Sequence, residues 1–255
     1  PINRAALEQA AAQGAEVVVA TGRFYGGIPQ ELRDLPFLRY FILMNGAKVY
    51  DRRMDKTLGR AEIPWETVEA VIDFLEPLHC SVDCFQNDRG LMARKYYDRL
   101  EQYVTHPPSF ALVKRTREPV DDLKEAVLAG GGSVQKLQAY FPDLELRPKV
   151  MEQCKLVFPD LVQAISMPAN LEFNAPDATK GNGLRTLCRC LGIDPREAAA
   201  FGDGTNDLSL LQEAGIGVAM ANGAPETLAA ADLTAPSNEE DGVAQILSRW
   251  FPPNT

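Results

Sequence analysis

Residues 198–207 read AAAFGDGTND, and this stretch decides the fold class of the chain. The apolar run 198–201 has no polar alternation, a pattern that is typical of a parallel strand covered on both faces. The glycines on either side of Asp203 permit a sharp turn, and Asp207 then falls in the first turn of a following helix. The stretch therefore predicts a strand, a turn and a helix, with two carboxylates where the strand ends.

The carboxylates of Asp203 and Asp207 can face one crevice, because a single turn separates them. Ligands of open α/β sheets bind at the carboxyl ends of the strands. Oxygen ligands that leave room for water suit Mg²⁺ better than zinc, so we predict that both residues are metal ligands. A calcium EF-hand loop fits poorly, because Leu208 and Ala214 stand where that loop needs glycine and glutamate. The alternative for Asp207 is an ordinary acidic first turn of a helix.

Three other buried-type runs, at 17–20, 40–44 and 216–220, predict further strands, and each is followed within two residues by a small polar residue and glycine. Glycine lets backbone N–H groups approach an anion closely, so these exits are candidates for phosphate binding. The alternative for the first exit is a simple turn closed by the threonine hydroxyl. The residues at the first two exits are Thr21, Gly22, Arg23, Asn45 and Gly46.

Lys180 introduces a predicted helix and has no apolar reason to stand there. A solvated surface position is the ordinary expectation for a lysine. In a cleft that already holds carboxylates and a phosphate, however, its ammonium group would balance negative charge. We therefore predict that Lys180 belongs to the same site as Asp203 and Asp207.

The middle of the chain, residues 53–176, has shorter and more alternating strand candidates, which predict an open α+β sheet with helices on one face. Strand–helix alternation resumes from residue 180. We therefore predict an α/β fold, with a parallel-sheet core at 1–52 and 177–255 that is interrupted by an inserted domain at 53–176. Within the insertion, the predicted strands are 81–86, 110–114, 134–140, 162–166 and 171–174, and the predicted helices are 64–75, 96–104, 120–128 and 144–157.

Composition and charge exclude several classes of function. The formal net charge is −9, whereas binding to a nucleic-acid backbone needs a basic face. With only two histidines, zinc sites of paired histidines and Ser–His–Asp triads are nearly excluded. Five cysteines without a framework spacing predict reduced, mostly buried thiols. No apolar run reaches the roughly 20 residues that span a bilayer, and no leader pattern is seen, so we expect a cytoplasmic protein without a membrane partner.

Four motifs, in this order, resemble those of the haloacid dehalogenase superfamily. Within it the resemblance is closest to the Cof-like phosphatases, whose large cap is inserted between the threonine and lysine motifs. The segments MANGA and SNEEDGV near the end of the chain are also similar to that subgroup. The four motifs are VVVATGR at 17–23, FILMNGA at 41–47, ATKG at 178–181 and FGDGTND at 201–207.

The resemblance implies a Rossmann-like core with an inserted α+β cap, and transfer of a phosphoryl group to an aspartate that water then dephosphorylates. By the matching motifs, Thr21 would bind the transferring phosphoryl group and Lys180 would orient it. Asp203 would ligate Mg²⁺ directly, with Asp207 supporting the metal or its waters. The remaining matched residues would contact the phosphate or line the substrate side, namely Gly22, Arg23, Asn45, Gly46 and Asn206.

One motif of the family is absent from the chain. The family's first motif, Asp-x-Asp-Gly-Thr after an N-terminal strand, carries the nucleophile and the general acid, whereas this chain opens at Pro1 with the helix that normally follows. Either the motif lies upstream of Pro1, or the protein is a catalytically inactive remnant. Loss of the family's central strand would open the sheet and expose its core, which favours the first explanation. We therefore expect the nucleophilic aspartate upstream of Pro1.

These inferences together predict a phosphatase that hydrolyses small phosphate monoesters, such as sugar phosphates, through an aspartyl-phosphate. The alternatives are an inactive phospholigand-binding or regulatory protein, and a phosphomutase, which returns the phosphoryl group to its product. The expected partner is a small phosphorylated metabolite. Specificity should come from the cap, where residues 94–97 form a polar–aromatic cluster that a solvated helix start explains equally well.

Overall fold

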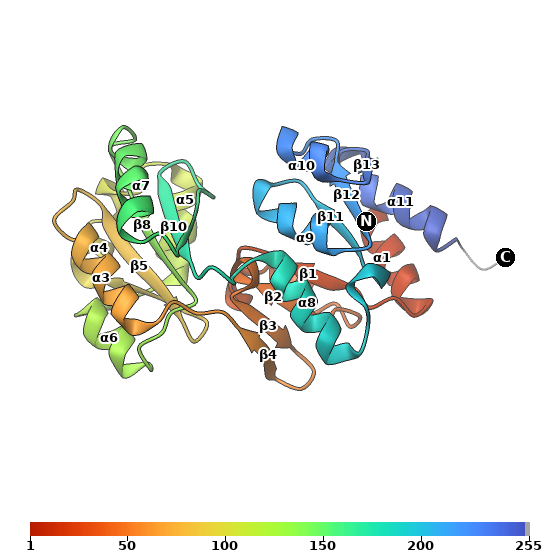
Figure 1. Ribbon diagram of the computed structural model, residues 1–255, viewed down its shortest axis with the longest axis horizontal. Helices are drawn as coiled ribbons and strands as arrows, with labels where there is room; N and C mark the ends of the chain where they lie inside the picture. The colour runs from red at the N-terminus through yellow and green to blue at the C-terminus, as the bar shows by residue number, and fades with distance from the viewer. Residues whose placement is uncertain (253–255) are drawn as a thin grey trace. The chain divides into compact units, whose positions relative to one another are not determined.

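A computed structural model describes residues 1–252 and divides the chain into two compact units. The core unit comprises Pro1–Arg23, Ile28–Arg60 and Thr179–Thr255, and the inserted unit comprises Phe24–Gly27 and Ala61–Ala178. Figure 1 colours the chain from red through yellow and green to blue, so the inserted unit is mainly orange to green. The α/β fold with an inserted domain is confirmed.

The strands of the core unit form two sheets. One has the order β1-β2-β3-β4, in which β1 and β2 are parallel and the other pairs are antiparallel. The second has the order β11-β12-β13 and is parallel throughout. The strands are β1 (Val18–Ala20), β2 (Tyr40–Leu43), β3 (Lys48–Asp51), β4 (Lys56–Arg60), β11 (Ala199–Gly202), β12 (Ile216–Met220) and β13 (Leu233–Ala235).

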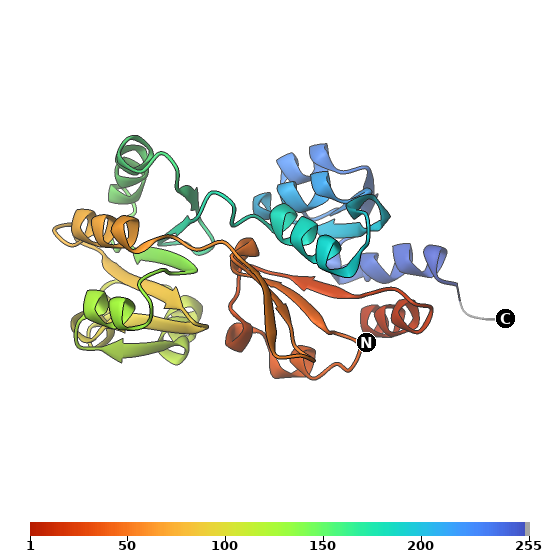
Figure 2. The ribbon, with the colours of Figure 1, turned by 60° about the horizontal axis from the view of Figure 1, so that its bottom comes forward.

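The helices of the core unit begin and end as their sequences favour. In α8, the Thr179 hydroxyl accepts a hydrogen bond from the N–H of Asn182, and Gly192 closes the helix with a left-handed backbone. Helices α1 and α11 lie side by side (Figures 1 and 2), and the Gln9 amide donates to the carbonyl of Phe251. The helices are α1 (Ile2–Ala12), α2 (Gln30–Arg33), α8 (Lys180–Leu191), α9 (Leu208–Glu213), α10 (Pro225–Ala230) and α11 (Gly242–Trp250).

The two sheets of the core unit each end in an open strand, β1 and β11. Among residues 1–252, β1 pairs only with β2, and β11 only with β12. The predicted strand at 17–20 is therefore half buried and not covered on both faces. Even so, Val18 and Ala20 pack in the same apolar cluster as Ala200. The sheets thus meet through side chains, and not through backbone hydrogen bonds.

The chain leaves and re-enters the core unit at neighbouring points. Arg60, the last residue of β4, pairs with Lys48 of β3. Two residues before Lys48, Gly46 lies so close to Thr179 that a Cβ atom on Gly46 would come within 2.0 Å of the Thr179 carbonyl oxygen. Gly46 also has a φ of +104°, a region that favours glycine. Both ends of the inserted segment are therefore held against one short stretch of the core.

The inserted unit is built on a six-stranded sheet of order β7-β6-β5-β8-β10-β9, in which only β6 and β7 are parallel. Gln86 of β5 donates to the carbonyl of Val127 in α6, and Gln163 of β9 donates to Met151 in α7. Both helices therefore cover the same face, as predicted. The elements are β5 (Ser81–Gln86), β6 (Arg89–Ala93), β7 (Arg117–Val120), β8 (Lys136–Tyr140), β9 (Val162–Ala164), β10 (Asn170–Asn174), α3 (Trp65–Leu75), α4 (Arg94–Tyr97), α5 (Pro107–Thr116), α6 (Leu123–Ala129) and α7 (Leu146–Val157).

The predictions about the insertion differ from the structure in one strand and in both boundaries. The predicted strand at 110–114 is wrong, because these residues lie in α5, which two prolines start and which buries Ser109 and Val113 one turn apart. The predicted boundary after residue 52 lies at Arg60 instead, since β4 pairs with β3 and extends the core sheet. The second boundary lies before Thr179 and not before residue 177.

The thiols agree with the prediction from cysteine spacing. All five cysteines are free, and Cys190 is the exposed one. Burial raises the pKa of Cys80 to about 12 and that of Cys154 to about 11. No helix in the part of the chain that the structure describes is long and apolar enough to cross a bilayer.

Candidate active site

A cavity of about 460 Å³ in the core unit collects most of the predicted site residues. It lies where β1 and β11 end, at the carboxyl edge of both sheets, as expected for an open α/β fold. Six predicted residues from three separate parts of the sequence, including both aspartates, line this cavity. The predicted residues that line it are Thr21, Gly22, Lys180, Asp203, Asn206 and Asp207.

Asp207 and Lys180 form a buried ion pair at this cavity. Each residue is 5% exposed, and the Lys180 Nζ lies 2.5 Å from the Asp207 Oδ1. The other carboxylate oxygen, Oδ2, accepts the N–H groups of Asp203 and Gly204 at 3.1 and 3.0 Å. Asp207 therefore holds the lysine in place and fixes the turn after β11.

Asp203 differs from Asp207 in its environment. Its side chain is exposed where it lines the cavity, whereas both oxygens of Asp207 already accept hydrogen bonds. The geometry therefore assigns different tasks to the two carboxylates. Asp203 is available to an incoming cation, while Asp207 would have to give up a contact to Lys180 or to the backbone.

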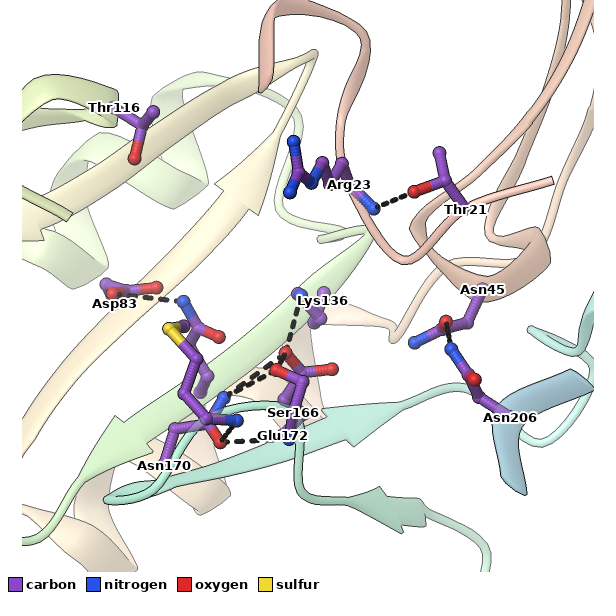
Figure 3. Close-up of polar contacts among 12 residues, drawn as sticks. Thr21, Arg23, Asn45, Asp83, Thr116, Lys136, Ser166, Asn170, Glu172 and Asn206 are labelled. Atoms are coloured by element: carbon purple, nitrogen blue, oxygen red, sulfur yellow. Dashed lines mark hydrogen bonds and ion pairs between the residues drawn. The ribbon is translucent and has the colours of Figure 1, made fainter. Parts of the chain in front are cut away.

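Thr21 follows the last residue of β1, and both its backbone N–H and its carbonyl form hydrogen bonds. Its N–H donates to the Ile42 carbonyl, and its own carbonyl accepts from the N–H of Asn45. The hydroxyl oxygen accepts from the N–H of Arg23 at 3.2 Å, as Figure 3 shows, so the simple turn considered as an alternative is formed. The hydroxyl still carries its own hydrogen, and it can donate that hydrogen to a phosphate oxygen while the turn persists.

Asn45 and Asn206 connect two of the strand exits. The Asn206 amide donates to the Asn45 Oδ1 at 3.1 Å, and Figure 3 shows the two side chains directed toward each other. Asn45 has a φ of +57°, in the left-handed region that asparagine tolerates better than most residues. Asn45 therefore positions Asn206 and does not itself line the cavity.

Three predicted substrate-side residues, Arg23, Asn45 and Gly46, are not among the residues that line the cavity. Gly46 packs against the backbone of Thr179, directly before Lys180, so its part in the site is indirect. The sequence reasoning also missed lining residues from α1, α11, the loop after β13 and the ends of β1, β11 and β12. The missed residues are Asn3, Ala20, Phe201, Gly202, Met220, Asn238 and Val243.

The missed residues carry weak sequence signals. The Asn3 Oδ1 accepts from the N–H of Ala244 in α11, so Asn3 reads as a helix contact. Asn238 donates its N–H to the Asn222 Oδ1, which ties the loops after β12 and β13 together. The segment around Asn238 had been matched only by family resemblance. Nothing in residue spacing alone would place either asparagine at the cavity.

The oxygen atoms at the cavity suit a hard cation, such as Mg²⁺, that retains several of its bound water molecules. Within residues 1–252, no group of three or more His, Cys, Asp or Glu residues could hold a metal ion on its own. Mg²⁺, however, is commonly held by one or two carboxylates together with waters and substrate phosphate oxygens. The exposed carboxylate of Asp203 beside the hydroxyl and amide groups of the cavity fits that pattern, and it does not fit a fully enclosed metal cage.

Comparison with protein-family models identifies one match that covers nearly the whole chain. The model describes haloacid dehalogenase-like hydrolases and matches residues 1–247. The Bacillus subtilis protein YxeH, which is named as a phosphatase, is 30% identical over 253 residues, covering 96% of this chain and 88% of YxeH. The Escherichia coli 5-amino-6-(5-phospho-D-ribitylamino)uracil phosphatase YbjI is 26% identical over 258 residues, covering 96% and 86%.

Solved structures give the same picture of the fold. A haloacid dehalogenase-like hydrolase from Bacteroides thetaiotaomicron superposes with a TM-score of 0.81 at 26% identity, covering 98% of this chain and 92% of that one. A sugar phosphatase of haloacid dehalogenase subclass IIB superposes with a TM-score of 0.79, also at 26% identity, covering 98% and 90%. Both similarities extend over the core and the insertion.

Proposed function

Because the chain belongs to the haloacid dehalogenase-like hydrolases and is a phosphatase, we propose that it hydrolyses small phosphate monoesters through an aspartyl-phosphate with the help of Mg²⁺. The observation that carries the proposal is the meeting of Thr21, Lys180 and the two aspartates around one cavity. A buried ammonium group and an exposed carboxylate at the carboxyl edge of the sheets suit a bound phosphoryl group and a cation.

Each residue at the cavity then has a defined task. The Thr21 hydroxyl donates a hydrogen bond to an oxygen of the phosphoryl group. The Lys180 ammonium, which Asp207 holds in place, offsets negative charge on the same group. The turn that Asp207 fixes presents the Asp203 carboxylate to the cation. Positioning and charge balance of this kind are the main contributions that proteins make to phosphoryl transfer.

The nucleophile is expected on an additional strand between β1 and β11. Both strands have an edge without a backbone partner among residues 1–252, and the cavity lies where these edges end. In the first step an aspartate oxygen would attack phosphorus, and the bond from phosphorus to the alcohol oxygen would break as that oxygen takes a proton from the general acid of the same upstream motif. In the second step water attacks phosphorus, which releases inorganic phosphate and restores the aspartate.

Magnesium would be held by Asp203 together with water and phosphate oxygens. When bound, it supplies positive charge that lowers the cost of charge on the phosphoryl oxygens. Asp207 would act on it at most through waters, because its oxygens bind Lys180 and the backbone. Depletion with a chelator should therefore abolish turnover, and added Mg²⁺ should restore it.

Release of inorganic phosphate from a broad panel of phosphate esters tests the proposal. The protein is assayed with the residues that precede Pro1 included, with Mg²⁺ and with chelator. We expect turnover of small esters, sugar phosphates first, and its loss in Lys180→Met. Failure to release phosphate from any ester, with an Asp-x-Asp motif confirmed before Pro1, would refute the proposal.

A phospholigand-binding protein without turnover is the second candidate. It is favoured by one observation, that the described cavity holds no carboxylate beyond Asp203 and Asp207. Neutral residues in place of both aspartates of the upstream motif would support it. Appearance of the phosphoryl group on an added sugar, and not on water, would support a phosphomutase instead. A cytoplasmic location also stays a prediction, which fractionation of cells would check.

A further inference from the structure

The inserted sheet has two edge strands, and their sequences differ in charge. β7, at one edge, has the sequence REPV, with two charged residues and a proline. Charged side chains and proline on an edge strand discourage pairing with another chain. β9, at the other edge, pairs only with β10 among residues 1–252, and its sequence VQA contains neither a charge nor a proline. The backbone groups on the open side of β9 can therefore pair with a further strand.

Exposed apolar side chains gather beside β9. Six large apolar side chains of the inserted unit are exposed, and five of them, 40–83% exposed, lie within residues 144–165. These residues comprise α7, β9 and the short segments next to them, and the Gln163 side chain of β9 donates to the carbonyl of Met151 in α7. Exposed apolar side chains that gather in one place mark interaction surfaces. The five residues, which we call the apolar patch, are Leu144, Leu156, Val157, Val162 and Ile165.

Two charged residues at opposite ends of β9 have no ion-pair partner among residues 1–252. Asp160, which lies two residues before β9, is exposed. At the other end, the Arg147 Nη1 donates to the carbonyl of Pro168, four residues after β9. The Arg147 Nε is buried without a hydrogen-bond partner in the same part of the chain. The open strand thus has a negative group at its start and a positive group at its end.

We propose that β9 pairs in antiparallel fashion with β9 of a second copy of this chain, so that Asp160 of each protomer lies beside Arg147 of its partner. In an antiparallel pair the start of one strand lies opposite the end of the other, so unlike charges meet at both ends. A two-fold axis generates both contacts at once, because the same surface is used by both protomers. The axis is perpendicular to the sheet, so it keeps α7 of both protomers on one face and brings the two apolar patches together.

The charge pattern identifies the partner as a second copy. A strand of another protein could pair with the open backbone and cover the apolar patch, but it would need no particular charge at either end of β9. Self-pairing requires unlike charges at the two ends of β9, since like charges would repel at both ends of the interface. Asp160 and Arg147 meet this requirement. The dimer interface lies entirely in the inserted unit, so it forms whether or not the protein hydrolyses phosphate esters.

The first test measures the mass of the whole protein, with the residues before Pro1 included, by sedimentation velocity at several concentrations. We expect twice the mass of one chain at high concentration. In Val162→Lys, an ammonium group on β9 of each protomer faces the other across the two-fold axis, so the dissociation constant should rise at least about 100-fold.

The matched control for this variant is Leu128→Lys. It also replaces an exposed apolar residue of the inserted unit by lysine, but Leu128 lies on α6, which contacts β5 and β6 and not β9. The dissociation constant of Leu128→Lys should therefore equal that of the wild-type protein.

The second test mixes two charge-reversed variants, Asp160→Arg and Arg147→Glu. Alone, each variant brings like charges together at both ends of β9, so each should be monomeric. In the mixture, one variant presents positive groups at both ends of the strand and the other presents negative groups. Only the mixed pair restores unlike charges, and sedimentation of the mixture should recover the dimer.

Recovery of the dimer in the mixture would support the inference, and so would a monomeric Val162→Lys beside a dimeric Leu128→Lys. A wild-type protein that stays monomeric at about 0.1 mM would overturn it. A dimer that persists in Val162→Lys, or that Leu128→Lys weakens to the same extent, would also overturn it, because the interface would then lie elsewhere. So would a mixture that stays monomeric although circular dichroism shows both charge-reversed variants to be folded. If Arg147→Glu does not fold, Val162→Lys and its control decide the inference.

Discussion

At the scale of single residues, the carboxylate of Asp207 does three things at once, since it binds the Lys180 ammonium and two backbone N–H groups. Replacing it with asparagine would leave a buried lysine without its counter-charge. We expect Asp207→Asn to lower the free energy of unfolding by about 3–5 kcal/mol, measured by urea denaturation. Phosphate release should fall at least about 100-fold, because Lys180 loses its position.

A matched control for this change lies nearby, between α8 and α9, the helix that follows Asp207. Arg185 of α8 and Glu213 of α9 also form an ion pair, but 51% of the Arg185 side chain is exposed. Glu213→Gln should therefore cost less than about 1 kcal/mol. If Asp207→Asn and Glu213→Gln lower the free energy of unfolding equally, burial of the Lys180–Asp207 pair does not explain the cost of losing that pair. A double variant, Lys180→Met with Asp207→Asn, should recover part of the stability lost in Asp207→Asn.

Asp51 gives a prediction about pH. The hydrogen bond from the Arg39 guanidinium holds the pKa of the Asp51 carboxyl below its usual 3.8, and backbone N–H groups of Met54 and Arg53 act in the same direction. A folded-state pKa below the unfolded value stabilises the protein above the unfolded pKa, and this stabilisation is lost as pH falls through the folded value. Asp51→Asn should therefore lower the melting temperature at pH 7.

The same comparison at acid pH is the check on this prediction. Below pH 3.8 the unfolded carboxyl takes up its proton first, so the advantage of aspartate over asparagine decreases until the folded carboxyl is protonated at its lower pKa. The gap between the two melting temperatures should narrow steadily toward pH 3. A gap of constant size over the whole range would contradict the assigned cause.

Most of the site could be predicted residue by residue, because its members follow buried runs directly. Thr21 and Asp203 stand at the first position after β1 and β11, where the edge of an α/β sheet gathers polar groups. The resemblance implied different tasks for Asp203 and Asp207, but residue spacing alone could not, since the difference depends on which oxygens accept backbone N–H groups. Asn3 and Asn238 were missed because tertiary packing alone brings them to the cavity.

At the scale of elements, the loop Met44–Gly46 docks on the N-terminus of α8. A Cβ on Gly46 would overlap the carbonyl of Thr179, whereas Gly14, with a similar φ of +98°, has nothing within 4 Å. Gly14→Ala should thus cost only the backbone strain, about 1 kcal/mol. Gly46→Ala should cost about 1–3 kcal/mol more, as an overpacked contact does. Chemical denaturation of both variants measures the difference, and equal costs would rule out the close contact.

Long periodic helices and most apolar strands were predicted well, including the short edge strands β1 and β9, whereas several other short elements were missed. The helix at 64–75 is confirmed as α3, and the strand at 81–86 as β5. β6 and β7 were missed because their sequences, RGLMA and REPV, carry charged residues and a proline. Pairing of β6 with β5, and of β7 with β6, is what makes them strands. Residues 94–97 form the short helix α4, where Arg94 and Lys95 pair with surface carboxylates.

At the scale of the whole molecule, the accessibility of the five thiols measures how well both units are packed, because each unit contains cysteines. Only Cys190 is exposed, while the other four are buried. Under native conditions a chromogenic disulfide reagent should modify one thiol quickly, and in strong denaturant all five. Burial that raises the pKa of Cys80, Cys84 and Cys154 slows their reaction further, since the thiolate is the reactive form. Rapid native modification of two or more thiols would contradict the described packing.

The division of the chain was predicted in outline, because strand–helix alternation stops and resumes along the sequence. Its boundaries were displaced, since the pairing of β4 with β3 is a property of the sheet and not of residues 56–60 themselves. The open edges of β1 and β11 were not visible as strand signals at all. An open edge is defined by the pairing partners of its strand, and the periodicity of a single sequence contains no information on those partners.

The inserted segment leaves and re-enters the core at neighbouring points. Arg60 lies beside Lys48, and Thr179 lies beside Gly46, so the insertion is attached to the core at one place. A replacement domain of any size whose own ends lie close together can be attached there without re-routing the core. The residues that line the cavity of the core unit and those of the inserted sheet can therefore change independently during evolution. Under the proposed function, exchange of residues 61–178 would give a lineage a new substrate while the residues at the cavity stay in place.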